Sequence, residues 1–191
     1  VASDLCKFSK LRPESIKTIY NPVVENNLIE SSKQKLDHPW FQDERNFVVL
    51  FVGRLESVKN LEILVRSFSY LKDHENIKLM IVGDGSQKKD LKNLSKALGL
   101  SNRVSFVGYS SNPYAYMRSS NLLVLCSKWE GLPTVLIEAM ACGTPVIATK
   151  NLAGAKEIFE DGTQGYLVEN SSEAIAEGIK RAMTHSFDTT S

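Results

Sequence analysis

Residues 48–82 read VVLFVGRLESVKNLEILVRSFSYLKDHENIKLMIV, and this stretch predicts the fold. It opens with the apolar run Val48–Gly53, which is typical of a strand covered on both faces. A second such run follows at Lys78–Val82. Between the two runs, apolar residues recur at helical spacing, at Leu61, Leu64, Val65, Phe68 and Leu71. The order strand, helix, strand predicts two parallel strands joined by a helical crossover.

The same alternation continues along the chain. Further strand-like runs are Val104–Val107, Asn121–Cys126, Pro145–Thr149 and Gly165–Val168. Helical patterns follow each strand, at Leu91 to Leu98, from Pro113, from Pro133, at Ala155–Phe159 and at Ile175 to Met183. We therefore expect an α/β fold with a doubly wound, three-layer parallel sheet of about six strands.

The N-terminal part is less regular. Ile16–Tyr20 has a strand-like pattern, whereas Glu25–Asn46 is largely polar without a clear period and is expected to be a surface loop. The chain opens in what looks like the middle of a pattern and stops after its last helix. We expect residues 1–191 to be a single domain cut from a longer protein.

The composition is that of a soluble globular protein, with 42% hydrophobic and 24% charged residues. No apolar run reaches the roughly 20 residues that cross a membrane, and the net charge of +1 gives no argument for nucleic acid. The three cysteines, Cys6, Cys126 and Cys142, are interpreted as free thiols of a reducing compartment, so we expect a cytoplasmic location. The histidines are isolated, and no metal site is expected.

In an open parallel sheet, ligands bind beyond the carboxyl ends of the strands. Arg54 and Lys59 flank the turn after the first strong strand, beside a helix start, and two cations there would suit phosphates. Gly53 would let a ligand approach the backbone closely. The alternative is a solvated basic loop.

The Gly131-Leu132-Pro133 turn would support the same site from another segment. Pro133 is expected as the first helical residue, which would leave the N–H groups of Thr134, Val135 and Leu136 free to face an anion or a sugar oxygen. The alternative is an ordinary helix start.

Glu138 lies among apolar residues and therefore needs a cationic partner, a proton or a function. Its side chain leans toward the start of the predicted helix, where its carboxylate could accept hydrogen bonds from ribose or hexose hydroxyls. Glu130 lies in the preceding loop. The alternative is that Glu138 pairs with a core arginine or lysine, or caps a turn.

Several nucleotide motifs are absent from the sequence. Gly83-Asp84-Gly85 lacks the third glycine of a dinucleotide fingerprint, and no acidic residue ends the next strand. There is no phosphate-binding P-loop, no nucleophile elbow and no D-x-D pair for a metal on a diphosphate. If a diphosphate binds, protein cations would have to neutralise it, and no metal is expected.

Four segments together resemble one family: GRLESVKN from Gly53, GDGS from Gly83, RVSFVG from Arg103 and EGLPTVLIEAMACGTPVIAT from Glu130. They resemble the C-terminal domain of the family-four retaining glycosyltransferases with the GT-B fold, also called glycosyltransferase group one. The resemblance runs from about Ile16 to Ala182. The family's signature is two glutamates separated by seven residues, matched here by Glu130 and Glu138.

The resemblance implies a role for each matching residue. Arg54 and Lys59 would hold the donor pyrophosphate and, with Glu130, act in catalysis. Glu130 would contact hydroxyls of the transferred sugar, and Glu138 would take the ribose hydroxyls. Backbone amides of Gly131, Leu132, Pro133 and Thr134 would lie near the phosphate and the sugar, beside Gly53, while Val104 and Phe106 would face the base. The family's Gly-Gly-x-Pro-Glu run is matched imperfectly, with Ala153 and Lys156 at its first and fourth places.

The implied function is that of the donor-binding half of a retaining glycosyltransferase. It would move a hexose from a UDP- or GDP-linked sugar to a hydroxyl acceptor in polysaccharide or glycolipid synthesis, without a cofactor or metal. Its partner would be the N-terminal acceptor domain, which this chain lacks. The alternative is a nucleotide-sugar binding module without turnover. The scattered cations Lys7, Lys10, Arg12 and Lys17 either contact anionic lipid at the inner face of a membrane or form a solvated surface.

Overall fold

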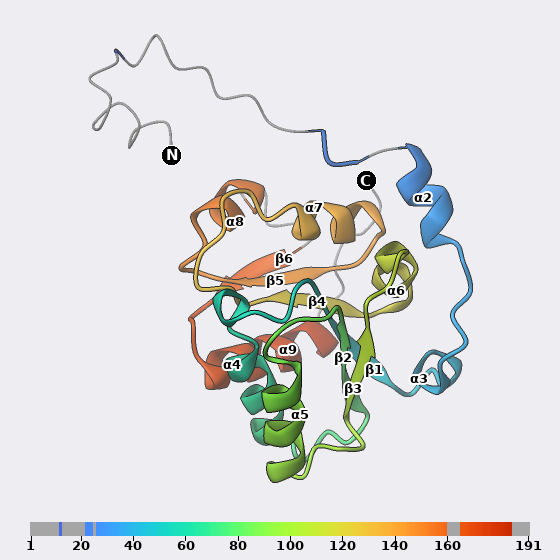
Figure 1. The fold of residues 1–191 in the computed structure, drawn as a ribbon, viewed down its shortest axis with the longest axis vertical. Coiled ribbons are helices and arrows are strands. Elements are labelled where there is room, and N and C mark those ends of the chain that lie inside the picture. The colour runs from blue at the N-terminus through green and yellow to red at the C-terminus, as the bar shows by residue number, and fades with distance from the viewer. Residues whose placement is uncertain (1–11, 13–21, 25, 160–164, 185–191) are drawn as a thin grey trace.

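The computed structural model describes residues 12, 22–24, 26–159 and 165–184. Within them, six parallel strands form one sheet in the order β3-β2-β1-β4-β5-β6 (Figure 1). The strands are β1 (Phe47–Val52), β2 (Ile77–Val82), β3 (Val104–Gly108), β4 (Leu122–Leu125), β5 (Val146–Thr149) and β6 (Gly165–Val168). The six strands expected from Val48 onward are confirmed.

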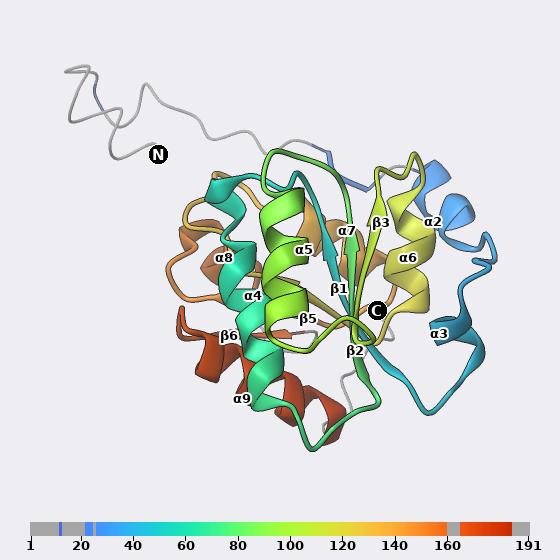
Figure 2. The same ribbon diagram turned by 60° about the horizontal axis from the view of Figure 1, so that its bottom comes forward.

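Helices cover both faces of the sheet, which confirms the three-layer α/β architecture. In Figure 1, α7 and α8 lie on one side of β5 and β6, and α9 lies on the other. Figure 2 shows α4 and α5 side by side in front of the strands. The helices that follow β1 are η2 (Ser57–Lys59), α4 (Leu61–Ser67), η3 (Phe68–Tyr70), α5 (Lys88–Ala97), α6 (Pro113–Ser119), α7 (Thr134–Ala141), α8 (Ala153–Ile158) and α9 (Ser172–Thr184).

The central strands are apolar because both of their faces are covered. Val49, Leu50 and Phe51 in β1 are completely buried. Leu50 pairs in register with Met80 of β2 and with Leu123 of β4. This arrangement explains why the run from Val48 shows no polar alternation.

The prediction of a surface loop at Glu25–Asn46 is wrong for part of this segment. The segment contains α2 (Asn26–Ser32) and α3 (Pro39–Gln42). Helix α2 packs against α6, and Leu28 is its one fully buried apolar residue. One buried apolar residue in a two-turn helix does not produce a detectable hydrophobic period in the sequence. Helix α3 is one turn long, and the His38 side chain accepts a hydrogen bond from the Trp40 N–H at its start.

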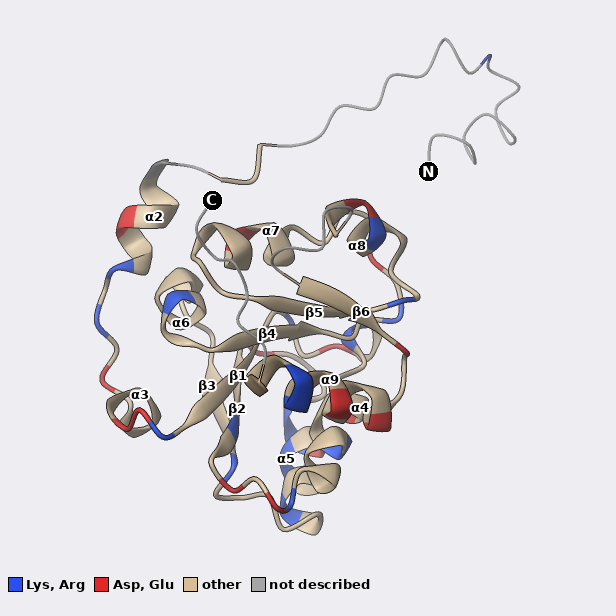
Figure 3. Ribbon diagram, turned by 180° about the vertical axis from the view of Figure 1, so that it is seen from behind, with Lys and Arg blue, Asp and Glu red and all other residues tan. Residues whose placement is uncertain are grey.

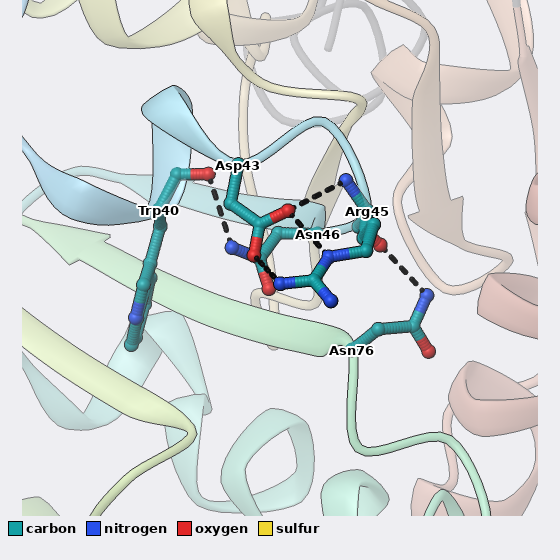
Figure 4. A network of polar contacts seen from close by, with 5 residues as sticks. All are labelled: Trp40, Asp43, Arg45, Asn46 and Asn76. Carbon is teal, nitrogen blue, oxygen red and sulfur yellow. Dashed lines mark hydrogen bonds and ion pairs between the residues drawn. The ribbon is translucent and has the colours of Figure 1, made fainter.

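Polar contacts fix the entry into β1 (Figure 4). Arg45 donates to both carboxylate oxygens of Asp43, at 2.9 and 2.8 Å, and the Asn46 amide donates to the Trp40 carbonyl. The Asn76 amide donates to the Arg45 carbonyl at 3.0 Å, which ties this turn to the start of β2. The turn lies at the amino end of the sheet and therefore away from the expected site.

Acidic and basic residues occur together over much of the ribbon seen from behind (Figure 3). Among the described residues, no helix is both long enough and apolar enough to cross a membrane. The strand-like Ile16–Tyr20 and the cations Lys7, Lys10 and Lys17 lie outside the described residues.

Candidate functional site at the carboxyl edge of the sheet

The strand order places a topological switch point between β1 and β4. From β1 the chain runs outward to β2 and β3, and from β4 it runs the other way to β5 and β6. Loops that leave neighbouring strands in opposite directions open a crevice at the carboxyl edge. The two loops at this crevice also bond each other, since the Lys128 N–H donates to the Val58 carbonyl at 2.7 Å.

Lys59 and Glu130 meet at this edge of the sheet. The Lys59 Nζ lies 2.6 Å from the Glu130 Oε1, although the two residues are 71 positions apart in sequence. The Ser127 hydroxyl donates to the same oxygen at 2.7 Å. Only 20% of the Lys59 side chain and 18% of the Glu130 side chain are exposed. The structure therefore brings together one cation and one carboxylate that the sequence analysis placed in a single site.

Arg54 lies at the same edge but faces solvent. Its guanidinium makes no hydrogen bond or ion pair with the described residues. The backbone around it is fixed, because the Leu55 N–H donates to the Asp84 carbonyl at 2.8 Å. The Ser86 hydroxyl and N–H both donate to the Glu56 carboxylate, and these bonds lower the Glu56 pKa. The positive charge of Arg54 also lowers the Glu56 pKa, so Arg54 is an exposed cation on a turn that hydrogen bonds hold in place.

Glycines are needed where the β1 and β2 loops cross. Gly83 has φ +141°, and a Cβ built on it would lie 1.9 Å from the Gly53 carbonyl oxygen. Gly53 itself has φ +152°, a backbone region that residues with side chains rarely adopt. The structure thus gives Gly53 a backbone role, while close approach of a ligand to it stays a prediction.

The start of α7 differs from the expectation in two ways. Helix α7 begins at Thr134, and Pro133 is its N-cap residue instead of its first helical residue. The Thr134 N–H donates to the Leu132 carbonyl at 2.9 Å and the Leu136 N–H donates to the Pro133 carbonyl at 3.0 Å. The tight turn before the helix therefore occupies two of the three amides expected to be free. Of those three, only the Val135 N–H donates to no described residue.

No lysine or arginine among the described residues pairs with Glu138, so the alternative of a core cationic partner is not met. Its half-buried position raises its pKa, opposed by a hydrogen bond with the Thr134 side chain one turn earlier, so the turn-capping alternative stays open. Glu138 lines a pocket of about 360 Å³ together with Thr134, Tyr114, Pro22, Val23, Asn27 and Leu28. A carboxylate without a cationic partner among the described residues thus lines a hollow near the start of α7.

The structure does not bring Val104 and Phe106 to the Lys59–Glu130 pair. Both lie on β3, the edge strand, and Val104 is its first residue, at the amino end. They line a separate pocket of about 340 Å³ with Ser95, Ser101 and Lys92, whose Nζ lies 5.8 Å from the Phe106 ring centroid. Contact of these two residues with a base stays a prediction.

Three residues near the site were not singled out from the sequence. Ser127 bonds Glu130, as described above. The Asn151 amide donates to the carbonyls of both Ser127 and Lys128 at 2.8 Å. A Cβ built on Gly154 would lie 2.5 Å from the Gly131 carbonyl oxygen, so the start of α8 packs directly on the loop. The sequence signal for Ser127 was its position, directly after a buried strand and three residues before Glu130.

Cys126 and Cys142 are free and buried, as expected, whereas Cys6 lies outside the described residues. Burial raises the Cys126 pKa to about 12 and the Cys142 pKa to about 11. No group of three or more His, Cys, Asp or Glu side chains in the described part of the chain could hold a metal ion.

Comparison with known proteins supplies a family. A family model described as "Glycosyl transferases group 1" matches residues 32–189. A Campylobacter jejuni relative, named N-acetylgalactosamine-N,N'-diacetylbacillosaminyl-diphospho-undecaprenol 4-alpha-N-acetylgalactosaminyltransferase, is 34% identical over 93% of this chain and 47% of its own length. The N-acetyl-alpha-D-glucosaminyl L-malate synthase of Bacillus anthracis is 31% identical over 82% of this chain and 41% of its own.

Solved structures agree. The crystal structure of Anabaena Alr3699/HepE in complex with UDP-glucose is 31% identical, covers 90% of this chain and 49% of its own, and superposes with a TM-score of 0.74. WaaG, a glycosyltransferase involved in lipopolysaccharide biosynthesis, shares the fold at 23% identity, with a TM-score of 0.80 over 96% of this chain and 51% of its own. The chain spans about half the length of the relatives it matches.

Proposed function

Because the chain belongs to the glycosyl transferases group 1 family, we propose that it is the donor-binding half of a retaining glycosyltransferase. The enzyme would move a hexose from a nucleotide diphosphate sugar to a hydroxyl acceptor. The observation that carries the proposal is the Lys59–Glu130 pair at the switch point, with Arg54 exposed at the same edge of the sheet. Cations and a carboxylate gathered there suit a ligand with both phosphates and hydroxyls.

Arg54 and Lys59 act on the diphosphate. When the bond between the sugar and the phosphate breaks, negative charge develops on the leaving diphosphate. A fixed donor aimed at that charge contributes about 3 kcal/mol to transition-state stabilisation. Arg54 is available for this role because it forms no hydrogen bond or ion pair with a described residue, while its charge acts on the nearby Glu56 carboxylate. Lys59 is shared between Glu130 and the phosphate.

The two glutamates act on hydroxyls. Glu130 accepts from the transferred sugar, and Glu138 accepts from the ribose. Glu138 supports this assignment because it is half buried, faces a pocket and has no cationic partner among the described residues. A half-buried carboxylate without a cationic partner destabilises the free protein, so a function in ligand binding accounts for it.

The solved neighbours support a choice of the first donor to test. Structures of Anabaena Alr3699/HepE were obtained with UDP and with UDP-glucose, so a UDP-linked hexose is the first donor to test, ahead of a GDP-linked one. The Campylobacter jejuni relative is named for a diphospho-undecaprenol-linked saccharide. We therefore propose an acceptor on the pathway to a polysaccharide or glycolipid, a cytoplasmic location and contact with the inner face of a membrane.

The other half of the enzyme is the expected partner, since the chain spans about half of its relatives. The same observation favours a second candidate for these 191 residues alone, a nucleotide-sugar binding module without turnover. Calorimetric titration of this chain with UDP-, GDP- and ADP-glucose, combined with a product assay, separates the two. Binding without hydrolysis or transfer supports the module, and binding with transfer shows that the chain is active alone.

The catalytic role is tested in the full-length enzyme. Lys59→Ala should lower turnover roughly 10²-fold, because one transition-state donor is lost. Lys150→Ala is the matched control, since Lys150 also forms an ion pair at the carboxyl edge, with Glu169. Equal turnover in both variants would refute the role of Lys59.

A further inference from the structure

The Glu130 carboxylate is held unequally at its two oxygens. Its Oε1 accepts from both the Lys59 ammonium at 2.6 Å and the Ser127 hydroxyl at 2.7 Å. No described residue donates to its Oε2. One oxygen is therefore used by the protein, and the other remains available to accept a hydrogen bond from a ligand.

Ser127 is itself rigidly placed. It lies two residues after the end of β4 and is completely buried. Its carbonyl accepts from the Asn151 amide, which also holds the carbonyl of Lys128, and the Lys128 N–H is bonded to Val58. Asn151 and Val58 belong to the loops on either side of this segment. Hydrogen bonds from the segments after both neighbouring strands, β1 and β5, therefore fix the backbone that carries the Ser127 hydroxyl.

Lys59 cannot hold the Glu130 carboxylate in a fixed orientation once a nucleotide sugar is bound. In the proposed function its ammonium moves to, or is shared with, a diphosphate that carries more negative charge than one carboxylate. The bond from Lys59 to Glu130 then weakens at the moment when Glu130 must be oriented toward the sugar. Ser127 is neutral, has no competing anion and keeps its bond in both states.

From these contacts, and resting on the proposed function, we infer that Ser127 is a positioning residue that holds Glu130 with its free Oε2 toward the donor sugar. Ser127 does not touch the donor in this account. Its removal would let the carboxylate rotate, which would weaken recognition of the sugar while leaving recognition of the nucleotide intact.

The test measures by calorimetry the binding of UDP-glucose and of UDP. If GDP-glucose or ADP-glucose binds better, that nucleotide sugar and its nucleoside diphosphate are used instead. For Ser127→Ala we expect about tenfold weaker binding of the nucleotide sugar, as for a lost hydrogen bond to a charged group, and an unchanged affinity for the nucleoside diphosphate. In a Glu130→Ala background, Ser127→Ala should have no further effect, because the residue acts through Glu130.

Ser67→Ala is the matched control for the loss of a buried hydroxyl. Ser67 is also completely buried, and its hydroxyl donates to the Leu64 carbonyl at 2.7 Å, in α4. Both serine variants should lower the urea midpoint by similar amounts, but only Ser127→Ala should change the ratio of the two affinities.

The outcomes distinguish this inference from the proposed function. Equal weakening of both ligands by Ser127→Ala would overturn it, since the residue would then support the whole loop. If Ser127→Ala binds both ligands as the unaltered chain does, while Lys59→Ala binds both more weakly, the role of Ser127 is refuted and the proposed function stands. If no nucleotide or nucleotide sugar binds the unaltered chain, the proposed function itself fails.

Discussion

Substitution of Gly154 by alanine tests whether α8 supports the site loop. Gly154 lies in the first turn of α8 without a positive φ, so alanine suits its backbone and would add up to about 1 kcal/mol of helix stability. The new Cβ, however, would lie 2.5 Å from the Gly131 carbonyl oxygen and 2.8 Å from the Pro133 Cδ. Gly131 must retreat by roughly 1 Å to restore ordinary contact.

The two effects oppose each other. Overpacking against backbone costs about 1–3 kcal/mol, which exceeds the gain in helix propensity. We expect a net loss of about 1 kcal/mol, or a fall of about 2–4 °C in Tm for a chain of this size. A shift of the loop by about 1 Å should also lower turnover of the full-length enzyme by up to 10²-fold.

The assay is urea unfolding followed by circular dichroism, with Gly178→Ala in α9 as the matched control. At Gly178 the new Cβ would lie 2.9 Å from the Val168 Cγ1 and 3.3 Å from the Ile147 Cδ1, so this variant also overpacks a helix, but far from the Gly131 loop. Gly178→Ala should therefore lose a similar amount of stability, about 1 kcal/mol, with turnover unchanged. If Gly154→Ala is as active as Gly178→Ala, the packing of α8 on the loop does not position the site.

Further changes test the charges and thiols. Because burial raises the Glu138 pKa above its ordinary 4.5, ionisation of Glu138 destabilises the fold at neutral pH, and this penalty disappears as pH falls below 4.5. In urea unfolding, Glu138→Gln should therefore be more stable than the unaltered chain at pH 7.5 and lose this advantage near pH 4. The variant should also bind the nucleotide sugar more weakly. If the variant and the unaltered chain are equally stable at both pH values, the assignment is contradicted. Arg54→Ala should lower turnover about 10²-fold and change stability by less than about 0.5 kcal/mol, whereas Arg118→Ala, at another exposed arginine, should change neither. Cys126 and Cys142, with pKa values raised to about 12 and about 11, should react with iodoacetamide at pH 8 only after unfolding, as mapped by mass spectrometry; labelling of native Cys126 would show that the strand end opens.

Hydrophobic patterning predicted the sheet well because its signal is strong. The β1 strand is apolar throughout since both of its faces are covered, and so is β4. Strand β5 is equally buried and is apolar up to its last residue, Thr149. Helix α2 was missed because Leu28 is its one fully buried apolar residue, and α3 because its four residues include no buried one. Leu28 anchors α2 through a contact with a helix that follows some eighty residues later, which no local pattern reveals.

The sequence allowed us to predict which residues lie at the candidate site, but not which of them form hydrogen bonds and ion pairs with each other. Strand ends gave Arg54, Lys59 and Glu130, since parallel strands bring their following loops to one edge. That Lys59 and Glu130 pair with each other depends on how the loops close over the crevice, which spacing alone does not specify. The occupied amides at the start of α7 depend likewise on the tight turn at Leu132–Pro133.

The central claim is that one nucleotide sugar lies at the carboxyl edge between β1 and β4. The most direct measurement is a crystal structure of this chain with the nucleotide sugar that binds best in the titration. The account predicts diphosphate oxygens within roughly 3 Å of the Lys59 ammonium and the Arg54 guanidinium, with ribose hydroxyls on Glu138. A nucleotide bound instead in the pocket beside Lys92 and Phe106, with the Lys59–Glu130 pair untouched, would contradict it.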